Sequence, residues 1–241
     1  MPHRIFVAGG TGYIGSRLIP LLIARGHHVT ALVRAGSEEK AKTRCEMYLG
    51  NALEGDSFGA QLREYDTFIH LVGVPHPSPS KAREFVAVDL RSGEEAIRVA
   101  SSAGIRHFIY VSVAQPAPVM EAYIKVRAVC EAALRASGMP ATILRPWYVL
   151  GPGHRWPLLL KPLYSAAERL PATRDGARRL GLVTLGQMIN TLTAATEDPP
   201  SGVRVFEVPQ IRSLGEAYSK CAEESAAKLR TAPETRSTPI T

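Results

Sequence analysis

The sequence has few cysteines, no long apolar run and no leader-like start. Its three cysteines, Cys45, Cys130 and Cys221, are odd in number and far apart, which argues against a disulfide framework or a paired-cysteine metal site. We interpret them as ordinary buried thiols. No apolar run approaches the roughly 18–20 residues of a membrane-spanning helix, and the N-terminus enters a strand-like segment without the apolar core of a signal peptide. We therefore expect a cytoplasmic protein with no membrane span and no metal site.

The composition is typical of a globular protein. Of the 241 residues, 45% are hydrophobic and 21% are charged, which excludes a disordered, collagen-like or coiled-coil chain. The net charge of +7 is compatible with an anionic partner. Apart from small clusters at 34–44 and 174–179 the positive residues are dispersed, and no basic tract carries interleaved aromatic residues. We therefore expect no nucleic-acid partner.

Segments with strand character alternate with segments of helical period as far as about residue 150. This alternation predicts an α/β fold with a doubly wound parallel sheet of about seven strands. An apolar stripe that begins with Ile14 and Leu18 predicts a helix between the first two strands, and longer helices are expected at 81–103 and 122–137. The expected strands are Arg4–Ala8, His28–Val33, Cys45–Leu49, Asp66–Val72, Arg106–Ser112, Ala141–Pro146 and Val203–Val208.

The strict alternation ends after residue 150. We predict that residues 1–150 form the main domain and that 151–230 form a small C-terminal lobe, which returns one strand to the sheet. A helix is expected within this lobe at 214–229. The polar tail, 231–241, has too few apolar residues to offset its ordering entropy, so we expect it to be flexible.

The strongest motif is the run IFVAGGTGYIG near the N-terminus. In such a strand–turn–helix unit the early glycines make the tight turn, Gly12 lets a pyrophosphate approach the backbone, and Gly15 lets the helix pack closely on the strand. The N–H groups of the helix N-terminus then face the anion. We therefore expect a Rossmann-type dinucleotide site. Its cofactor-binding residues at this turn are Gly9, Gly10, Thr11, Gly12, Tyr13, Ile14 and Gly15.

The end of the second strand indicates which dinucleotide is bound. An acidic residue there binds the ribose 2′-hydroxyl of NAD, whereas an arginine accommodates the 2′-phosphate of NADP. Here the strand ends in ALVRAGSEEK, so that Arg34 occupies the position with no acidic residue beside it, and Ser37 and Lys40 follow nearby. The pattern favours NADP over NAD. The alternative is that Arg34 is an ordinary solvated loop cation.

The motifs AGGTGYIGSRL, GNALEGD, HLVG, YVSVA and ILRPWYVLGPG resemble, in this order, those of the short-chain dehydrogenase/reductase superfamily. The resemblance is to its atypical branch of NAD(P)-binding, NmrA-like and sugar-nucleotide-epimerase-like proteins, and it covers about residues 4–150. It implies that Asn51 and Ala52 flank the adenine and that Leu71, Val72 and Gly73 line the cofactor groove. It also implies that Pro146 lies near the nicotinamide.

Active members of that superfamily use a serine, a tyrosine as general acid/base, and a lysine four residues after the tyrosine. The matching residues are Ser112, Tyr123 and Arg127, so that the lysine is replaced. Tyr123 and Arg127 share a helix face, whereas Lys125 is rotated by about 200° and cannot substitute. An arginine is bulkier and forked and differs from a lysine in its reach to the ribose hydroxyls. Ordinary amphipathic residues beside the cofactor are the equal alternative to a catalytic role for Ser112 and Tyr123.

Aromatic and cationic residues gather after the sixth expected strand, at the sheet edge where open α/β folds bind ligands. We predict that they contact the substrate, with core anchoring as the alternative role of the tryptophans. These residues are Trp147, Tyr148, His154, Arg155 and Trp156. Two functions are compatible with the sequence: an NADP-dependent oxidoreductase or epimerase acting on a carbonyl or secondary alcohol, and a non-catalytic NADP(H)-binding regulator or assembly subunit. An oligomer is possible, and the substrate is unknown.

Overall fold

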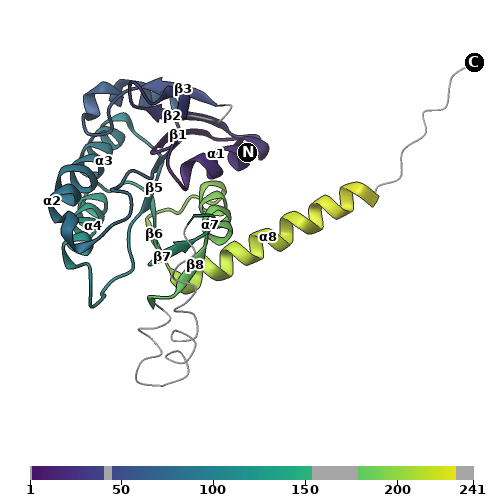
Figure 1. Cartoon of the computed structure of the whole chain (residues 1–241). Helices are drawn as coiled ribbons and strands as arrows, with labels where there is room; N and C mark the ends of the chain where they lie inside the picture. Colours follow the sequence, from purple (N-terminus) through teal and green to yellow (C-terminus); the bar gives the residue numbers. More distant parts are fainter. Residues whose placement is uncertain (1, 41–44, 154–178, 232–241) are drawn as a thin grey trace, which may run out of the picture.

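The structure is a computed structural model that describes residues 2–40, 45–153 and 179–231. A seven-stranded parallel sheet runs through its centre in the order β3-β2-β1-β4-β5-β6-β9 (Figure 1). This confirms the predicted doubly wound α/β fold. The strands are β1 Arg4–Ala8, β2 His28–Val33, β3 Glu46–Leu49, β4 Thr67–His70, β5 His107–Val111, β6 Ala141–Arg145 and β9 Val203–Glu207.

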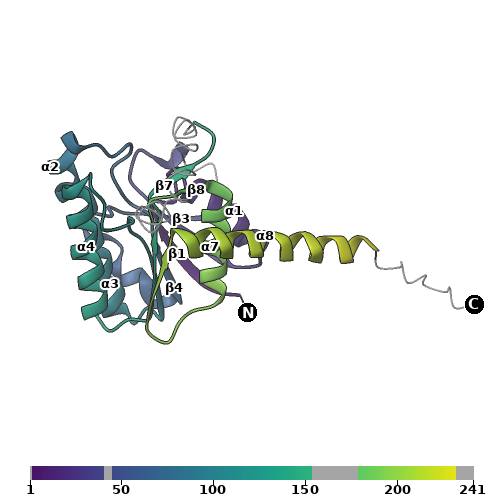
Figure 2. The same cartoon turned by 90° about the horizontal axis from the view of Figure 1, so that it is seen from below.

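Helices cover both faces of the sheet. In Figures 1 and 2, α1 and α7 lie on one side of it and α3 and α4 on the other. The α-helices are α1 Gly15–Ala24, α2 Ala82–Glu84, α3 Arg91–Ala103, α4 Glu121–Ala136, α7 Leu185–Glu197 and α8 Val208–Thr231. Short 3₁₀ turns occur at Glu38–Lys40, Gly55–Ser57, Gly59–Glu64 and Pro79–Lys81, and the π-helix Phe85–Leu90 leads directly into α3.

Alternating side chains of the strands feed two separate cores. In β1, Ile5 and Val7 join Leu18 of α1 in one aliphatic cluster, whereas Phe6 belongs to the cluster on the opposite face. The two-residue period of a strand produces this division. The second cluster is rich in rings, and the rings of Phe68 and Phe108 stack with their centroids 5.1 Å apart. Both faces of the sheet are therefore buried, as expected for a parallel sheet.

The C-terminal part contains elements that the sequence patterns did not predict. Strands β7 (Tyr148–Leu150) and β8 (Leu182–Thr184) pair in parallel as a separate two-stranded sheet. Helix α7 follows β8 and starts with a capping box, in which the side chains of Thr184 and Gln187 each bind the other's backbone N–H. The spacing Thr-x-x-Gln was the available signal for this helix.

Helix α8 begins earlier than predicted. It starts at Val208, directly after β9, because Val208 and Ile211 are buried in the aliphatic core. Its first turns pack on α7, and the rest of the helix extends away from the body (Figures 1 and 2). No helix of the described residues combines the length and apolarity needed to cross a membrane.

The cysteines differ from the expected buried thiols in two of three cases. Cys130 is buried between α4 and the start of α3, as predicted. Cys45 is half-buried and Cys221 is exposed on α8.

Candidate functional site

The sheet order reverses at β1, which lies between β2 and β4. In open α/β sheets the loops at such a point diverge, and ligands bind in the crevice between them. Here the loop after β1 turns at Gly9, whose φ of +84° is a left-handed conformation. A Cβ atom at Gly9 would lie 2.7 Å from the carbonyl carbon of Leu71, so the loops after β1 and β4 touch at this residue.

The remaining glycines of the turn have different tasks. A Cβ at Gly10 would lie 2.9 Å from the Ile19 side chain, and one at Gly15 would lie 2.5 Å from the carbonyl oxygen of Gly9. Both glycines are therefore required by the packing of α1 on β1. A Cβ at Gly12 would meet only the carbonyl oxygen of Gly9, at 3.2 Å. Packing within the protein therefore gives a weaker reason for a glycine at Gly12 than at Gly10 or Gly15. A glycine here fits a backbone that a phosphate group approaches closely.

Helix α1 presents its N-terminus to the same turn. Ile14 stands at its N-cap position, and no side chain caps it. The N–H groups of Ser16 and Arg17 already bond the carbonyl oxygens of Gly12 and Ile14. The helix dipole still favours negative charge at this end. The turn therefore fits the pyrophosphate of a dinucleotide.

Three hollows follow one another along the crevice. The first, of about 230 Å³, lies between the ends of β2 and β3 and the loop after β4. Arg34 is exposed at its edge, directly after β2. Among the described residues that line it there is no aspartate or glutamate. The lining residues are Gly9, Thr11, Leu32, Arg34, Ser37, Gly50, Asn51, Ala52, Leu53, Val72 and Val88.

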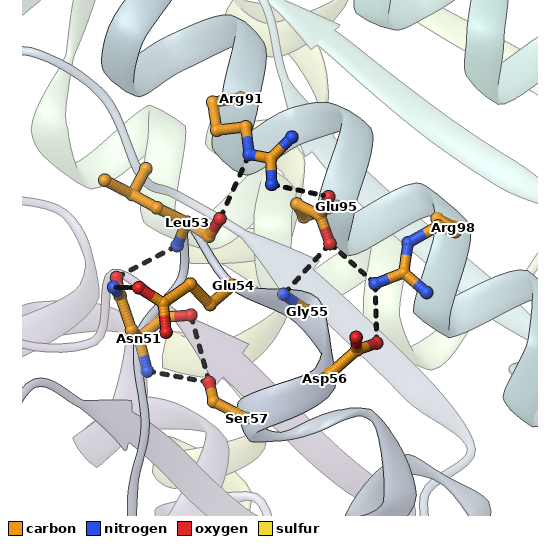
Figure 3. A network of polar contacts seen from close by, with 9 residues as sticks. All are labelled: Asn51, Leu53, Glu54, Gly55, Asp56, Ser57, Arg91, Glu95 and Arg98. Carbon is orange, nitrogen blue, oxygen red and sulfur yellow. Dashed lines mark hydrogen bonds and ion pairs between the residues drawn. The ribbon is translucent and has the colours of Figure 1, made fainter.

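A polar network fixes the wall that carries Asn51 (Figure 3). The Asn51 side chain accepts a bond from the N–H of Leu53 at 3.1 Å and donates one to Glu54 at 2.9 Å. Helix α3 holds the same loop from the other side, because Arg91 donates to the carbonyl oxygen of Leu53 and Glu95 accepts from the N–H of Gly55. The hydrogen bonds of the Asn51 side chain thus stabilise the loop itself, and the loop backbone forms the wall of the first hollow.

The second hollow, of about 310 Å³, shares Gly9 and Val72 with the first. It is lined by the glycine turn and by the loop after β4. Leu71, Val72 and Gly73, which the resemblance assigns to the cofactor groove, lie together in this lining. Tyr123 and Arg127 of α4 close its far end.

The third hollow, of about 490 Å³, shares Tyr13, Pro77 and Tyr123 with the second. The predicted substrate residues Trp147 and Tyr148 lie in its wall. Trp147 also packs against the aliphatic core, which is the anchoring role considered as its alternative. The other described lining residues are His76, Val113, Met120 and Val149.

Tyr123 lines both the second and the third hollow. Its ring packs against Phe85 of the π-helix, with centroids 4.9 Å apart, and against the guanidinium of Arg127, whose Cζ lies 5.1 Å from the ring centre. The i, i+4 spacing on α4 brings Tyr123 and Arg127 together as predicted.

Arg127 is a buried tie between several elements. It is 4% exposed and forms an ion pair with Asp89, which is 0% exposed in the π-helix. It also donates to the carbonyl oxygens of Val111, at 3.0 Å, and of Val72, at 3.4 Å. Burial opposes the charge of Arg127, but its interactions with Tyr110, Tyr123 and Asp89 hold its pKa above the ordinary value. Arg127 therefore stays charged and joins the ends of β4 and β5.

Ser112 is engaged elsewhere. It is 3% exposed, and its hydroxyl donates to Glu131 of α4 at 2.6 Å. Glu131 also binds Gln115 and Arg145, and Arg145 reaches on to Glu207 of β9. Ser112 is absent from the described linings of the three hollows, as are Gly10 and Pro146. The remaining predicted substrate residues, His154, Arg155 and Trp156, lie outside the described residues.

Sequence reasoning missed part of the site. His76, Pro77 and Met120 lie in loops whose sequences carry no motif, and Val113 was not predicted although it belongs to the motif YVSVA. Asp89 was also missed, although a single acid in the apolar run FVAVDL was a signal for a buried partner of a cation.

The chain matches a family model described as NAD(P)H-binding over residues 9–155. A 3 beta-hydroxysteroid dehydrogenase/Delta 5→4-isomerase of Mycobacterium tuberculosis is 29% identical over 115 residues, which are 45% of this chain and 31% of that protein. The chain thus spans about a third of the length of this relative. A ceramide reductase of Caulobacter vibrioides is 24% identical over 92% of this chain and 69% of its own length. An uncharacterised sugar epimerase of Bacillus subtilis is 31% identical over 59% of this chain and 71% of its own length.

Solved structures agree on the fold. The enzyme WbmH of Bordetella bronchiseptica, in complex with NAD+, superposes with a TM-score of 0.66 at 17% identity and covers 100% of this chain and 86% of its own. A UDP-glucose 4-epimerase of Thermus thermophilus, in complex with NAD, has a TM-score of 0.61 at 19% identity and covers 91% and 83%. At this level of identity the structures support only the fold, whereas the match to the family model includes more than half of the sequence and begins at the glycine turn. The chain therefore belongs to the NAD(P)H-binding family of short-chain dehydrogenase/reductase-like proteins.

Proposed function

We propose that the protein is an NADP(H)-dependent oxidoreductase that interconverts a carbonyl group and a secondary alcohol. The observation that carries this proposal is the place of Tyr123, which lines both the dinucleotide crevice and the aromatic hollow beyond it. A phenol at that junction can exchange a proton with a substrate in the third hollow. The dinucleotide supplies or accepts the hydride when bound.

The residues of the crevice have separate roles in binding and in proton transfer. The glycine turn and the N-terminus of α1 bind the pyrophosphate, and Arg34 with Ser37 binds the 2′-phosphate. Tyr123 Oη gives its proton to the oxygen of the carbonyl as that oxygen becomes a hydroxyl. Arg127 places a fixed positive charge against the Tyr123 ring, where it stabilises the phenolate that remains.

A non-catalytic role as an NADP(H)-binding regulator or assembly subunit is the second candidate. Two observations favour it. Arg127 occupies the position of the superfamily lysine and is engaged with Asp89 and two backbone carbonyls, and the hydroxyl of Ser112 is committed to Glu131. Both candidates require dinucleotide binding, and turnover distinguishes them.

The valine variant Gly12→Val tests the dinucleotide site. Its side chain would occupy the space that we assign to the pyrophosphate, while the protein around it offers only the carbonyl oxygen of Gly9 as a close contact. We expect a cooperative melt close to that of the wild type and a loss of NADPH affinity of at least about tenfold, because one well-placed interaction amounts to about 1.4 kcal/mol. Calorimetric titration measures the affinity. Unchanged affinity in a folded variant would show that the glycine has only a structural role.

The alanine variant Arg34→Ala tests the preference for NADP(H). A charge-assisted bond to the 2′-phosphate is worth roughly 1.5–3 kcal/mol, so we expect NADPH to lose about 10- to 150-fold in affinity while NADH binding stays nearly constant. Arg83→Ala is the matched control, because Arg83 is also exposed but is absent from the described linings of the crevice. A wild-type protein that binds NADH as tightly as NADPH would contradict the assignment.

A further inference from the structure

The third hollow is walled mainly by rings and aliphatic groups. Tyr13, Tyr123, Trp147 and Tyr148 contribute four aromatic side chains to it. Pro77, Val113, Met120 and Val149 supply most of the remaining wall. Aromatic walls favour flat ligands, because ring faces offer a large contact area at little conformational cost. At about 490 Å³ the hollow is large enough for a fused ring system.

The backbone around this hollow adopts a costly conformation at two positions. Among the described residues, the non-glycine residues with positive φ are His76, at 50°, and Met120, at 64°. Both line the third hollow. Side-chain-bearing residues adopt this conformation where the surrounding structure imposes it, and such residues concentrate at ligand sites. The loops after β4 and β5 are thus shaped to present these two side chains to one cavity.

The charge around the hollow indicates which ligands suit it. Among the described residues that line it there is no lysine or arginine. Three described arginines lie near it, and each has a partner. Arg127 lies in the second hollow and is paired with Asp89, Arg17 lies over the Tyr13 ring and donates to the Tyr13 carbonyl oxygen, and Arg179 donates to the carbonyl oxygen of Pro116. A nucleotide sugar would bring two phosphate groups against these walls, whose described residues include no lysine or arginine to pair them, at the cost of desolvating the phosphates. An apolar ketone has a single polar atom to satisfy, and Tyr123 stands in the wall to meet it.

We propose that the third hollow binds a flat, apolar ketone. This inference rests on the proposed oxidoreductase function and names the substrate class of the same site. The carbonyl oxygen of the ketone meets Tyr123, and its ring system lies among Trp147, Tyr148 and Met120. The long, flexible side chain of Met120 lets the wall adapt to rings of different outline.

Calorimetric titration of the full chain tests the proposal, with 2-acetylnaphthalene as the flat ketone and UDP-glucose as the nucleotide sugar. The protein is saturated with NADP+, which cannot reduce the ketone, so that the readout is binding alone. We expect the ketone to bind at least tenfold more tightly than UDP-glucose. The reverse order would overturn the inference in favour of a nucleotide sugar.

Two variants locate the binding. Met120→Lys places an ammonium in the apolar wall and is expected to weaken ketone binding by about tenfold or more, because the charge must be desolvated. The control is Val119→Lys. The side chain of Val119, next to Met120 in the sequence, is 54% exposed and absent from the described lining, so we expect this variant to bind the ketone as the wild type does. If Met120→Lys melts early, Met120→Ala replaces it, with a severalfold loss expected from reduced contact. Equal affinity in Met120→Ala and the wild type would overturn the assignment.

The two proposals can fail separately. NADP+ binding without ketone binding would refute the apolar substrate and leave the oxidoreductase function standing. Ketone binding without oxidation of NADPH, for this ketone and related ones, would support the hollow as a binding site and refute the catalytic function.

Discussion

Replacing Tyr123 by phenylalanine should lower kcat by about 10²- to 10⁴-fold, the usual contribution of a general acid or base. The ring that packs against Phe85 and Arg127 is retained, so the fold and the affinity for NADPH should remain close to wild type. The loss should appear in kcat and kcat/KM alike, because the proton moves in the transition state. Steady-state oxidation of NADPH with a ketone substrate measures the effect.

A matched control removes a phenol elsewhere. Tyr65 packs against Phe6 and donates its hydroxyl to Thr30, away from the crevice, so Tyr65→Phe should leave kcat unchanged. Arg127→Lys then separates the two candidate functions. In an enzyme adapted to arginine it should reduce turnover, since an ammonium does not reproduce the planar fork. A non-catalytic protein would show no change or gain faint activity. Turnover of Tyr123→Phe at the wild-type rate would refute the catalytic role of Tyr123.

Replacing Arg127 by methionine should lower the free energy of unfolding by about 3–5 kcal/mol, the usual cost of leaving one partner of a buried ion pair alone. The stranded partner is Asp89, whose carboxylate then keeps the N–H of Val74 as a hydrogen-bond donor. Burial already raises the pKa of Asp89, and Arg127 opposes this rise. Without Arg127 the pKa rises further. A carboxyl group whose pKa is raised by folding stabilises the folded state at low pH, and this stabilisation is lost as the pH increases. The loss of unfolding free energy in Arg127→Met should therefore become smaller toward pH 5.

Urea unfolding of the variant at several pH values measures both effects. The double variant Arg127→Met with Asp89→Leu removes both charges, and it should recover much of the stability because no buried carboxylate remains unpaired. Arg135→Met is the control, because Arg135 lies on the same helix but is largely exposed. A single variant as stable as the wild type at neutral pH would show that the pair makes no net contribution.

The sequence predicted the sheet well because the sheet is buried on both faces. Strands β1 and β2 have the predicted bounds, since continuous apolar runs end at Gly9 and at Arg34. β4, β5 and β6 are shorter than predicted. After β4 the chain turns toward the crevice, where the carbonyl oxygen of Val72 accepts a bond from Arg127. The small sheet of β7 and β8 was missed because two strands of three residues, far apart in sequence, carry no periodic signal.

The dinucleotide part of the site was foreseeable for a similar reason. Glycines at a strand-to-helix turn have tasks that are fixed by local geometry, and the turn has the form that these tasks require. Of the residues that line the aromatic hollow, Trp147 and Tyr148 were predicted as substrate residues, and Tyr13 and Tyr123 were predicted in other roles. The rest come from loops whose approach depends on tertiary structure. The partner of Ser112 could not be inferred either, since the bond to Glu131 joins residues 19 positions apart.

Glu131 links two walls of the third hollow through hydrogen bonds. Its carboxylate holds Ser112 and Gln115 at the end of β5 and also Arg145 at the end of β6, just before Trp147 and Tyr148. Because one buried carboxylate holds both walls, we expect a displacement of one to displace the other. The remaining wall includes the exposed residues His76 and Pro77, and we expect changes in the outline of the cavity to arise on that side.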